Sequence, residues 1–268
     1  MNLNIAISTC PNDIYIFYAL IEKKISTNIN LKFSFYDIEE LNNYCLKHKF
    51  DIIKISANLY KKVKNNYIIL DAGSALGFNC GPLIVSKYLK SLSSLENKRI
   101  GIPGENTTAN RLFDIFVNKK VEKIFMRFDK IMPAIIEGKI DAGVIIHEGR
   151  FVYKQYNLLK IADLGELWEK KTGKPIPLGI IVAKKNLSGK ILLEVNDLIK
   201  KSINFEPKDM NFIKNFAVEM DEETIKNHIK LYVNKFSYSL GETGREAIRE
   251  FLGLKEEKIF LRGEENVS

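Results

Sequence analysis

Residues 4–23, NIAISTCPNDIYIFYALIEK, contain an apolar run followed by a turn and a helical pattern. The apolar run Asn4–Ser8 predicts a buried strand, and apolar residues at helical spacing over Asp13–Lys23 predict an amphipathic helix. Asn12 stands where its side chain would cap the first turn of that helix. The chain therefore begins with a strand–helix unit.

The same alternation continues along the chain. Predicted strands at Leu31–Tyr36 and Asp51–Ile55 flank a predicted helix at Ile38–His48, and a second series of strands and helices begins near Arg99. This order predicts an α/β fold with mostly parallel sheets covered by helices. The polar passage at 86–98 indicates a crossover between two lobes. We expect a first α/β lobe of residues 1–90 plus 185–268 with C-terminal helices, and a second of residues 97–184.

The composition is that of a soluble globular protein. Of the 268 residues, 46% are hydrophobic and 28% charged, and no apolar run approaches the roughly 18 residues of a membrane-spanning helix, so we expect no membrane insertion. The net charge is +8, but only seven of the 41 basic residues are arginines, which are preferred for phosphate and base contacts. We therefore expect no nucleic-acid partner. Three cysteines without a C-x-x-C pattern, and no signal-like segment before Asn4, predict a cytoplasmic location.

Loops that follow strands are the places to look for a binding site, because parallel α/β sheets bind ligands at the carboxyl ends of their strands. Thr107 and Thr108 follow such a strand and stand at a predicted helix start, an arrangement suited to a carboxylate or a phosphate. One of these threonines could instead cap the helix. Ser56 has the same two interpretations, because it precedes the predicted helix Ala57–Val63.

His147 is the histidine that stands at the carboxyl end of a predicted strand, Asp141–Ile146. A neutral imidazole that emerges from a buried strand is suited to general-base chemistry near neutral pH. The alternative is a histidine that is merely hydrogen bonded at the strand end. His48 and His228 lie in lysine-containing helical segments, and we expect them to be solvated.

The remaining polar candidates carry weaker signals. Cys10, beside Pro11, could act as a nucleophile or simply pack near the helix start. Asp13 could line a binding cleft or stabilise the N-terminus of the predicted helix. No Ser-His-Asp spacing and no metal-ligand motif can be read from the sequence, so we predict no metal site.

Taken together, these loops resemble the 1,4-dihydroxy-6-naphthoate synthase family of the futalosine route to menaquinone. The resemblance covers residues 3 to about 185, with Ile14 and Leu167 as minor departures from the family's usual residues. The matching stretches are Ser8–Asp13, Ala75–Gly77, Gly81-Pro82, Ile102–Gly104, Thr107–Ala109, DAGVIIHExRF at 141–151, Asp163–Gly165, Trp168-Glu169 and Thr172–Gly179.

The resemblance implies a two-lobed fold similar to the type II periplasmic binding proteins, with a cleft between the lobes. It also implies a lyase without cofactor that converts cyclic dehypoxanthinyl futalosine, an aryl carboxylate, to 1,4-dihydroxy-6-naphthoate and dihydroxyacetone. By position, His147 corresponds to the family's proton acceptor. The substrate-binding residues that we expect are Asn12, Lys54, Ile55, Ser56, Thr107 and Thr108.

Three alternatives stay open. The chain could be a non-catalytic solute-binding protein of the same fold, the chorismate dehydratase of the same pathway, or an effector domain of a LysR-type regulator. The absence of a signal segment, the Ile-Ile-His-Glu and Thr-Thr motifs, and the absence of a helix-turn-helix before Asn4 favour the synthase. The sequence makes no prediction of the oligomeric state.

Overall fold

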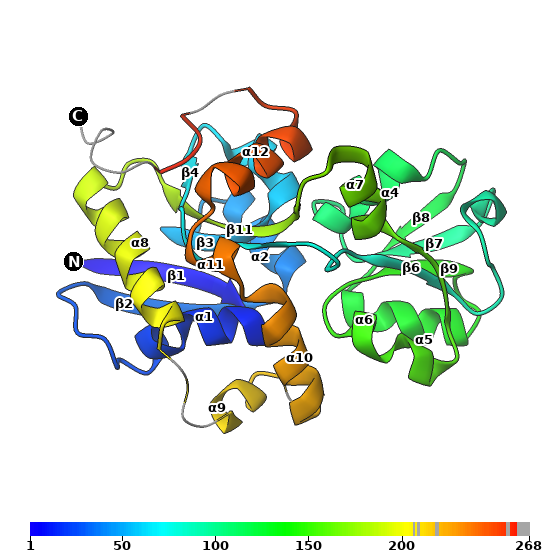
Figure 1. Ribbon diagram of the computed structural model, residues 1–268, viewed down its shortest axis with the longest axis horizontal. Coiled ribbons are helices and arrows are strands. Elements are labelled where there is room, and N and C mark those ends of the chain that lie inside the picture. The colour runs from blue at the N-terminus through cyan, green and yellow to red at the C-terminus, as the bar shows by residue number, and fades with distance from the viewer. Residues whose placement is uncertain (206, 208–209, 218–219, 256–257, 262–268) are drawn as a thin grey trace. The chain divides into compact units, whose positions relative to one another are not determined.

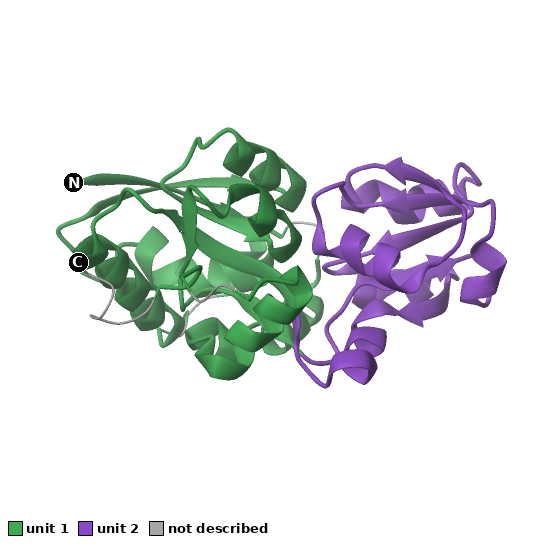
Figure 2. Ribbon diagram, turned by 90° about the horizontal axis from the view of Figure 1, so that it is seen from above, with its two compact units in different colours: residues 1–77, 177–268 green, residues 78–176 purple. Residues whose placement is uncertain are grey.

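The computed structural model describes residues 1–205, 207, 210–217, 220–255 and 258–261. It divides the chain into two compact units, Met1–Gly77 with Pro177–Ser268 and Phe78–Ile176 (Figure 2). Each unit is built around its own β-sheet, to which helices are packed (Figure 1). Among the helices in the described ranges, none is long and apolar enough to cross a bilayer.

The sheet of the first unit is mixed. Its strand order is β2-β1-β3-β11-β4, with β5 paired to β11. Strand β1 runs parallel to β2 and β3, whereas β11 runs antiparallel to β3 and β4. The strands are β1 (Asn2–Ser8), β2 (Asn30–Tyr36), β3 (Ile52–Ser56), β4 (Tyr67–Ile69), β5 (Ala75–Gly77) and β11 (Ile176–Lys184).

The helices of the first unit start where the sequence supplies caps. The helix after β2 begins with a capping box, in which Asp37 accepts from the N–H groups of Glu39 and Glu40 while the Glu40 carboxylate accepts from the Asp37 N–H. The helices are α1 (Pro11–Ile21), α2 (Ile38–Leu46), the 3-10 turn η1 (Ala57–Leu59), α3 (Tyr60–Val63), α8 (Gly189–Ile203), α9 (Asn211–Lys214), α10 (Glu222–Tyr232), α11 (Lys235–Tyr238) and α12 (Gly241–Leu252).

Helix α1 begins earlier than predicted. Pro11 is its first residue, because the fixed backbone angle of proline suits that position and its missing N–H would have no partner there. Asn12 therefore lies inside the first turn and does not cap it. The helix packs against α8 and α10 (Figure 1), and Ile14 and Phe17 are fully buried in the core of this unit.

The second unit has a five-stranded mixed sheet in the order β10-β6-β9-β7-β8. Strand β7 runs parallel to β8 and β9, whereas β6 runs antiparallel to β9 and β10. The strands are β6 (Leu83–Ser86), β7 (Arg99–Ile102), β8 (Glu122–Phe125), β9 (Ala142–Ile145) and β10 (Leu159–Asp163). The expectation of mostly parallel sheets is thus correct for β1 with its neighbours β2 and β3, and for β7 with its neighbours β8 and β9. The pairs of β11 with β3 and β4, and of β6 with β9 and β10, are antiparallel.

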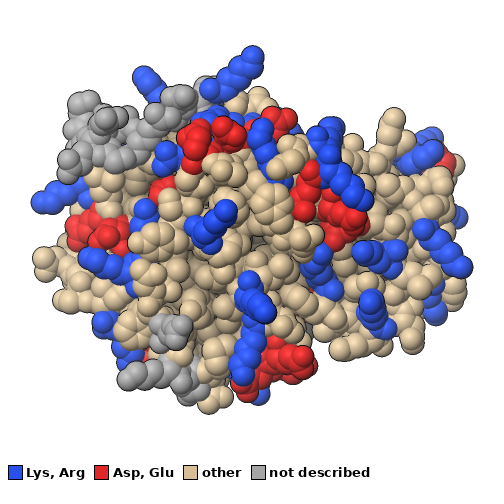
Figure 3. Space-filling model, in the orientation of Figure 1, with Lys and Arg blue, Asp and Glu red and all other residues tan. Residues whose placement is uncertain are grey.

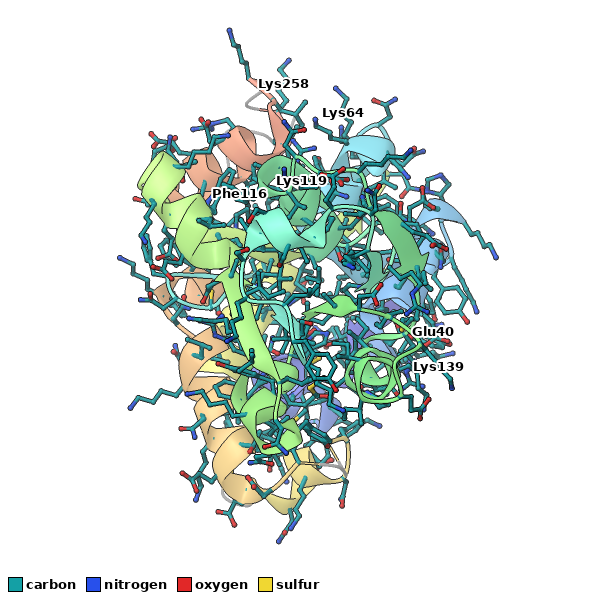
Figure 4. All side chains as sticks on the ribbon, turned by 90° about the vertical axis from the view of Figure 1, so that its right-hand side faces the viewer. Glu40, Lys64, Phe116, Lys119, Lys139 and Lys258 are labelled. Carbon is teal, nitrogen blue, oxygen red and sulfur yellow. The ribbon has the colours of Figure 1, made fainter. Side chains whose placement is uncertain are left out.

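The helices of the second unit pack closely on its sheet. Gly143 of β9 lies under the Ile131 side chain, and a Cβ added at Gly143 would be 2.2 Å from Ile131 Cγ2. Phe116 is labelled in Figure 4, and the Lys171 ammonium lies 5.8 Å from its ring centroid, joining α4 to α7. The helices are η2 (Leu92–Leu95), α4 (Thr108–Phe116), η3 (Phe128–Lys130), α5 (Ile131–Ile136), α6 (Gly149–Val152), η4 (Tyr153–Tyr156) and α7 (Leu164–Thr172).

The boundaries of the two units differ from those predicted. Strand β6, expected in the first lobe, forms its hydrogen bonds with β9 and β10 and belongs to the second unit. Strand β11, expected in the second lobe, pairs with β3 and β4 and belongs to the first unit except for Ile176. The polar passage 86–98 is therefore a connection within the second unit. Strand pairing decides the boundary, and composition alone misplaces it.

Candidate functional site

His147 follows β9 in a strained turn. Its backbone has φ +53°, in the left-handed region that few non-glycine residues adopt. The imidazole meets the ring of Phe128 edge-on, with 4.9 Å between the ring centroids. The residue is half-buried. An orientation fixed by an aromatic neighbour and a strained backbone is typical of functional positions.

The chain just after His147 is anchored by Arg150. Its guanidinium donates to the carbonyl oxygen of Gly81 at 2.6 Å and to Asp163 Oδ2 at 2.7 Å. The Asp163 carboxylate is 6% exposed, and its other oxygen accepts from the N–H groups of Gly165 and Glu166, which caps α7. Arginine is suited to this position, because its rigid fork donates in two directions at once.

Gly81 and Gly165 allow the two main chains that contain them to come into contact. A Cβ added at Gly81 would lie 2.3 Å from the Gly165 backbone, closer than real side-chain atoms come.

Burial raises the pKa of the neighbouring Cys80 thiol to about 12, so this cysteine stays protonated at neutral pH. The segments around Gly81, Arg150 and Asp163, which are separate in the sequence, are thus joined to one another next to the chain that follows His147.

Thr107 caps α4. Its hydroxyl accepts from the Asn110 N–H at 3.2 Å and donates to the Gly104 carbonyl at 2.8 Å. The capping interpretation is therefore correct for Thr107, whose hydroxyl proton is already used inside the loop. Thr108 is the first residue of α4 and is 4% exposed.

Asn110 holds the threonine loop in shape. Its Nδ2 donates to the Glu105 carbonyl at 2.8 Å, and its Oδ1 accepts from Lys123 Nζ at 2.8 Å. Together with the bond to Thr107, these contacts tie the loop to α4 and β8. The amide groups at the start of α4 are thus presented by a fixed backbone, as anion binding requires.

Ser56 does not cap the helical turn that follows it. Its Oγ accepts from Asn42 Nδ2 at 3.0 Å, and its N–H donates to Asn42 Oδ1 at 2.9 Å. Asn42, on α2, is fully buried, and sequence reasoning missed it. The available signal was an asparagine on the same helix face as the buried Ile38, Leu41 and Cys45.

Lys54 and Asp13 form a buried ion pair in the first unit. Lys54 Nζ lies 2.6 Å from Asp13 Oδ1, and the two side chains are 4% and 1% exposed. Asn12 Nδ2 donates to the same oxygen at 2.8 Å. Lys54 and Asn12, both expected to bind substrate, are therefore brought together by Asp13. Ile55, the third residue expected from this strand, is fully buried among its sheet neighbours.

One histidine differs from the prediction. His228 is 1% exposed, and its ring lies 4.5 Å from that of Tyr232. The lysines that suggested a solvated helix, Lys226 and Lys230, are on its exposed face, whereas His228 is on the same buried face as Ile225. His48 is exposed as expected and stacks on Tyr67.

The sheet topology places the second unit's candidates at one edge. Strands β7 and β9 are parallel neighbours, with Ile100 paired to Ala142 and Gly101 to Gly143. The threonine loop follows β7 and His147 follows β9, so both leave the sheet at its carboxyl end. Within the described part of the chain, no group of three or more His, Cys, Asp or Glu side chains is arranged to hold a metal ion.

The fold is that of the periplasmic binding proteins. The alkanesulfonate-binding protein of Xanthomonas axonopodis pv. citri superposes with a TM-score of 0.68 at 10% identity, over 86% of this chain and 84% of that protein. A crystal structure of an Archaeoglobus fulgidus protein superposes with a TM-score of 0.89 at 30% identity, over 94% of this chain and 96% of that one. The predicted fold class is confirmed.

The chain belongs to the menaquinone biosynthesis family, whose sequence profile matches residues 3–257. It is 35% identical to a 1,4-dihydroxy-6-naphthoate synthase of Thermus thermophilus, over 92% of this chain and 91% of that protein. It is 38% identical to a 1,4-dihydroxy-6-naphthoate synthase of Streptomyces coelicolor, over 93% of this chain and 91% of that protein. The family predicted from the motifs is therefore confirmed.

Proposed function

We propose that this protein is a carbon–carbon lyase that converts cyclic dehypoxanthinyl futalosine to 1,4-dihydroxy-6-naphthoate and dihydroxyacetone. The observation that carries the proposal is the identity of 35% and 38% with two such synthases over more than nine tenths of the chain. The turn at the carboxyl end of β9, with its histidine in a strained and oriented position, supplies a group suited to the chemistry.

His147 acts as the general base. Its imidazole removes the acidic proton beside the ring ketone of the substrate, and cleavage of the carbon–carbon bond follows. Formation of the aromatic ring drives the reaction forward. A positioned base of this kind contributes roughly 10²–10⁴-fold to the rate. The proposal is supported by the half-buried ring, which is oriented by Phe128 and remains partly accessible.

The substrate carboxylate binds at the start of α4. The N–H groups of Thr108 and Ala109, the first two residues of the helix, and the Thr108 hydroxyl are the proposed donors, because helix N-termini favour anions. Thr107 acts here by shaping the loop, since its hydroxyl proton is donated to Gly104. In the first unit, the residues proposed to contact or position the substrate are Asn12, Lys54, Ile55 and Ser56.

The substrate is a small molecule, the reaction needs no cofactor, and the enzyme works in the cytoplasm together with the rest of the biosynthetic route. A nucleic-acid partner is disfavoured by the charge distribution. On the face drawn in Figure 3, Lys and Arg side chains are scattered among acidic and uncharged ones instead of forming a continuous stripe.

Turnover by the purified protein tests the proposal. We expect incubation with cyclic dehypoxanthinyl futalosine to produce 1,4-dihydroxy-6-naphthoate, followed by its absorbance, whereas chorismate should remain unchanged. Conversion of chorismate would instead identify the dehydratase of the same pathway. Tight binding of the futalosine derivative without any product would identify a solute-binding protein. Either of these results would overturn the proposal.

A further inference from the structure

We propose that Asp13 is a positioning residue that orients the substrate-binding groups of the first unit, acting through Asn12 and Lys54 without touching the substrate itself. This inference rests on the proposed function, because it concerns residues assigned there to the substrate. An aspartate that only stabilised the N-terminus of α1 would not be expected to affect substrate binding, whereas a positioning residue would.

The Asp13 carboxylate is fully occupied by protein donors. Oδ1 accepts from Lys54 Nζ at 2.6 Å and from Asn12 Nδ2 at 2.8 Å. Oδ2 accepts from Ser8 Oγ at 2.7 Å and from the Ser8 N–H at 3.4 Å. A carboxylate has about four acceptor positions, and Asp13 is 1% exposed. The Asp13 carboxylate therefore orients the side chains that donate to it and has no acceptor position left for a ligand.

Two further contacts hold the Lys54 side chain in this place. Its ammonium also donates to the Gly73 carbonyl at 3.3 Å. A Cβ added at Gly179, on the neighbouring strand β11, would lie 2.6 Å from Lys54 Cε, so this side chain needs the glycine beside it. Lys54 and Ser56 stand two residues apart on β3 and share one face of the strand. A displaced Lys54 would thus disturb the face on which Ser56 lies.

Stability alone does not account for a buried ion pair at this position. Well-packed apolar side chains of similar volume usually stabilise a fold as well as a buried pair does, because both charges lose their hydration. The Asp13–Lys54 pair instead joins α1 to β3, and through Asn12 it fixes the direction of an amide group that the substrate is proposed to meet.

The test compares Asp13→Asn with Asp51→Asn. Asp51 directly precedes the same strand and pairs with Lys184 at 3.1 Å, so it is an ion-pair control from a more exposed pair, whose side chains are 25% and 22% exposed. We expect Asp13→Asn to raise KM about tenfold or more with kcat little changed, and to weaken binding of the product 1,4-dihydroxy-6-naphthoate by a similar factor. The control should leave both values unchanged. Unchanged KM and product affinity in a folded Asp13→Asn protein would overturn the inference.

A second variant keeps the test decisive if Asp13→Asn does not fold. Gly179→Ala retains every charged group but forces the Lys54 side chain to move, and we expect the same rise in KM. Unchanged KM and product affinity in that variant would overturn the inference. If the wild-type protein turns over the substrate and both variants have its KM and product affinity, the role of Asp13 is excluded and the proposed function remains. If the wild-type protein neither turns over the substrate nor binds the product, the proposed function fails together with it.

Discussion

Arg150, three residues beyond His147, places its Nη2 atom 2.7 Å from Asp163 Oδ2, in a pair whose side chains are 17% and 6% exposed. The same guanidinium binds the Gly81 carbonyl, so one side chain joins the β9 turn to two other segments. The chain that directly follows the proposed base is therefore anchored by groups that do not react.

Arg150→Lys should reduce kcat while the protein stays folded. A lysine retains the charge but cannot donate in two fixed directions, so the His147 turn loses one of its anchors. We expect a decrease of about tenfold, measured by steady-state kinetics with the thermal midpoint recorded in parallel. Arg99→Lys, at a pair with Asp141 whose side chains are 42% and 33% exposed, serves as the control and should change kcat little. Equal activity of both variants would show that Arg150 does not position the turn.

His147→Ala should lower kcat by roughly 10²–10⁴-fold, the contribution of a general base. The matched control is His48→Ala, because His48 is exposed in the first unit and is not part of the proposed site. Turnover by His147→Ala that equals the wild-type rate within error would remove His147 from the mechanism.

Substitutions at Thr107 and Thr108 should have different effects, the first on the stability of the protein and the second on substrate binding. Thr107→Val removes a helix cap, which lowers stability by about 1 kcal/mol, and Thr107→Ser should retain it. Thr108→Val removes a proposed donor to a carboxylate, a bond that contributes roughly 1.5–3 kcal/mol, so KM should rise about tenfold or more. Chemical denaturation and steady-state kinetics measure the two effects. A Thr108→Val protein with wild-type KM would place the carboxylate elsewhere.

Gly81→Ala should destabilise the second unit severely. The new Cβ would meet the Gly165 backbone at 2.3 Å, and neither main chain has a flexible end to move. Overpacking typically destabilises by about 1–3 kcal/mol and occasionally more, and a clash between two main chains belongs at the upper end of that range. Gly138→Ala is the control, because nothing lies within 4 Å of its added Cβ and only its left-handed φ of +70° adds strain, about 1–2 kcal/mol. A smaller effect at Gly81 than at Gly138, measured by denaturant titration, would contradict this packing.

Asp71 should make stability depend on pH. Burial raises the pKa of its carboxyl, but hydrogen bonds from Lys200 and Ser239 and the charges of Lys200 and Arg245 outweigh burial and hold it below its ordinary value of 3.8. Because the pKa is lower in the folded state, the carboxylate stabilises the fold above about pH 4, and this stability is lost as the pH falls through the folded-state pKa.

Asp71→Asn should therefore lower the free energy of unfolding by roughly 2–3 kcal/mol at neutral pH, with the difference from wild type shrinking on acidification. Asp197→Asn, whose pair with Lys201 is largely exposed, should show no measurable change. A difference between Asp71→Asn and wild type that is independent of pH would contradict the assignment of the charge.

Much of the local structure could be predicted because caps and periodicity act within a few residues. The helix predicted at Ile38–His48 forms as α2, Ile38–Leu46, because its apolar residues recur at helical spacing. The placement of His147 at a strand end follows in the same way. Strand direction could not be predicted, because a buried strand such as β11 has the same apolar pattern whether its neighbours run parallel or antiparallel to it.

The hydrogen-bond and ion-pair partners of the site residues could not be predicted from the sequence either. Asn42 bonds Ser56 from a different element, and Asp13 meets Lys54 across 41 positions of the chain. Such contacts depend on how the elements pack. His228 was misplaced for a similar reason, since its neighbours in the sequence are on the opposite face of the helix.

In the proposed reaction, His147 removes a proton and the substrate divides into an aromatic acid and a three-carbon fragment. Both products can be quantified in one reaction, for the wild-type protein and for His147→Ala at equal concentration. We predict equal amounts of 1,4-dihydroxy-6-naphthoate and dihydroxyacetone from the wild-type protein, and at least about a hundredfold slower release of both from the variant. Naphthoate formed without the three-carbon product would exclude this carbon–carbon cleavage, and naphthoate formed equally fast by His147→Ala would exclude His147 as the base.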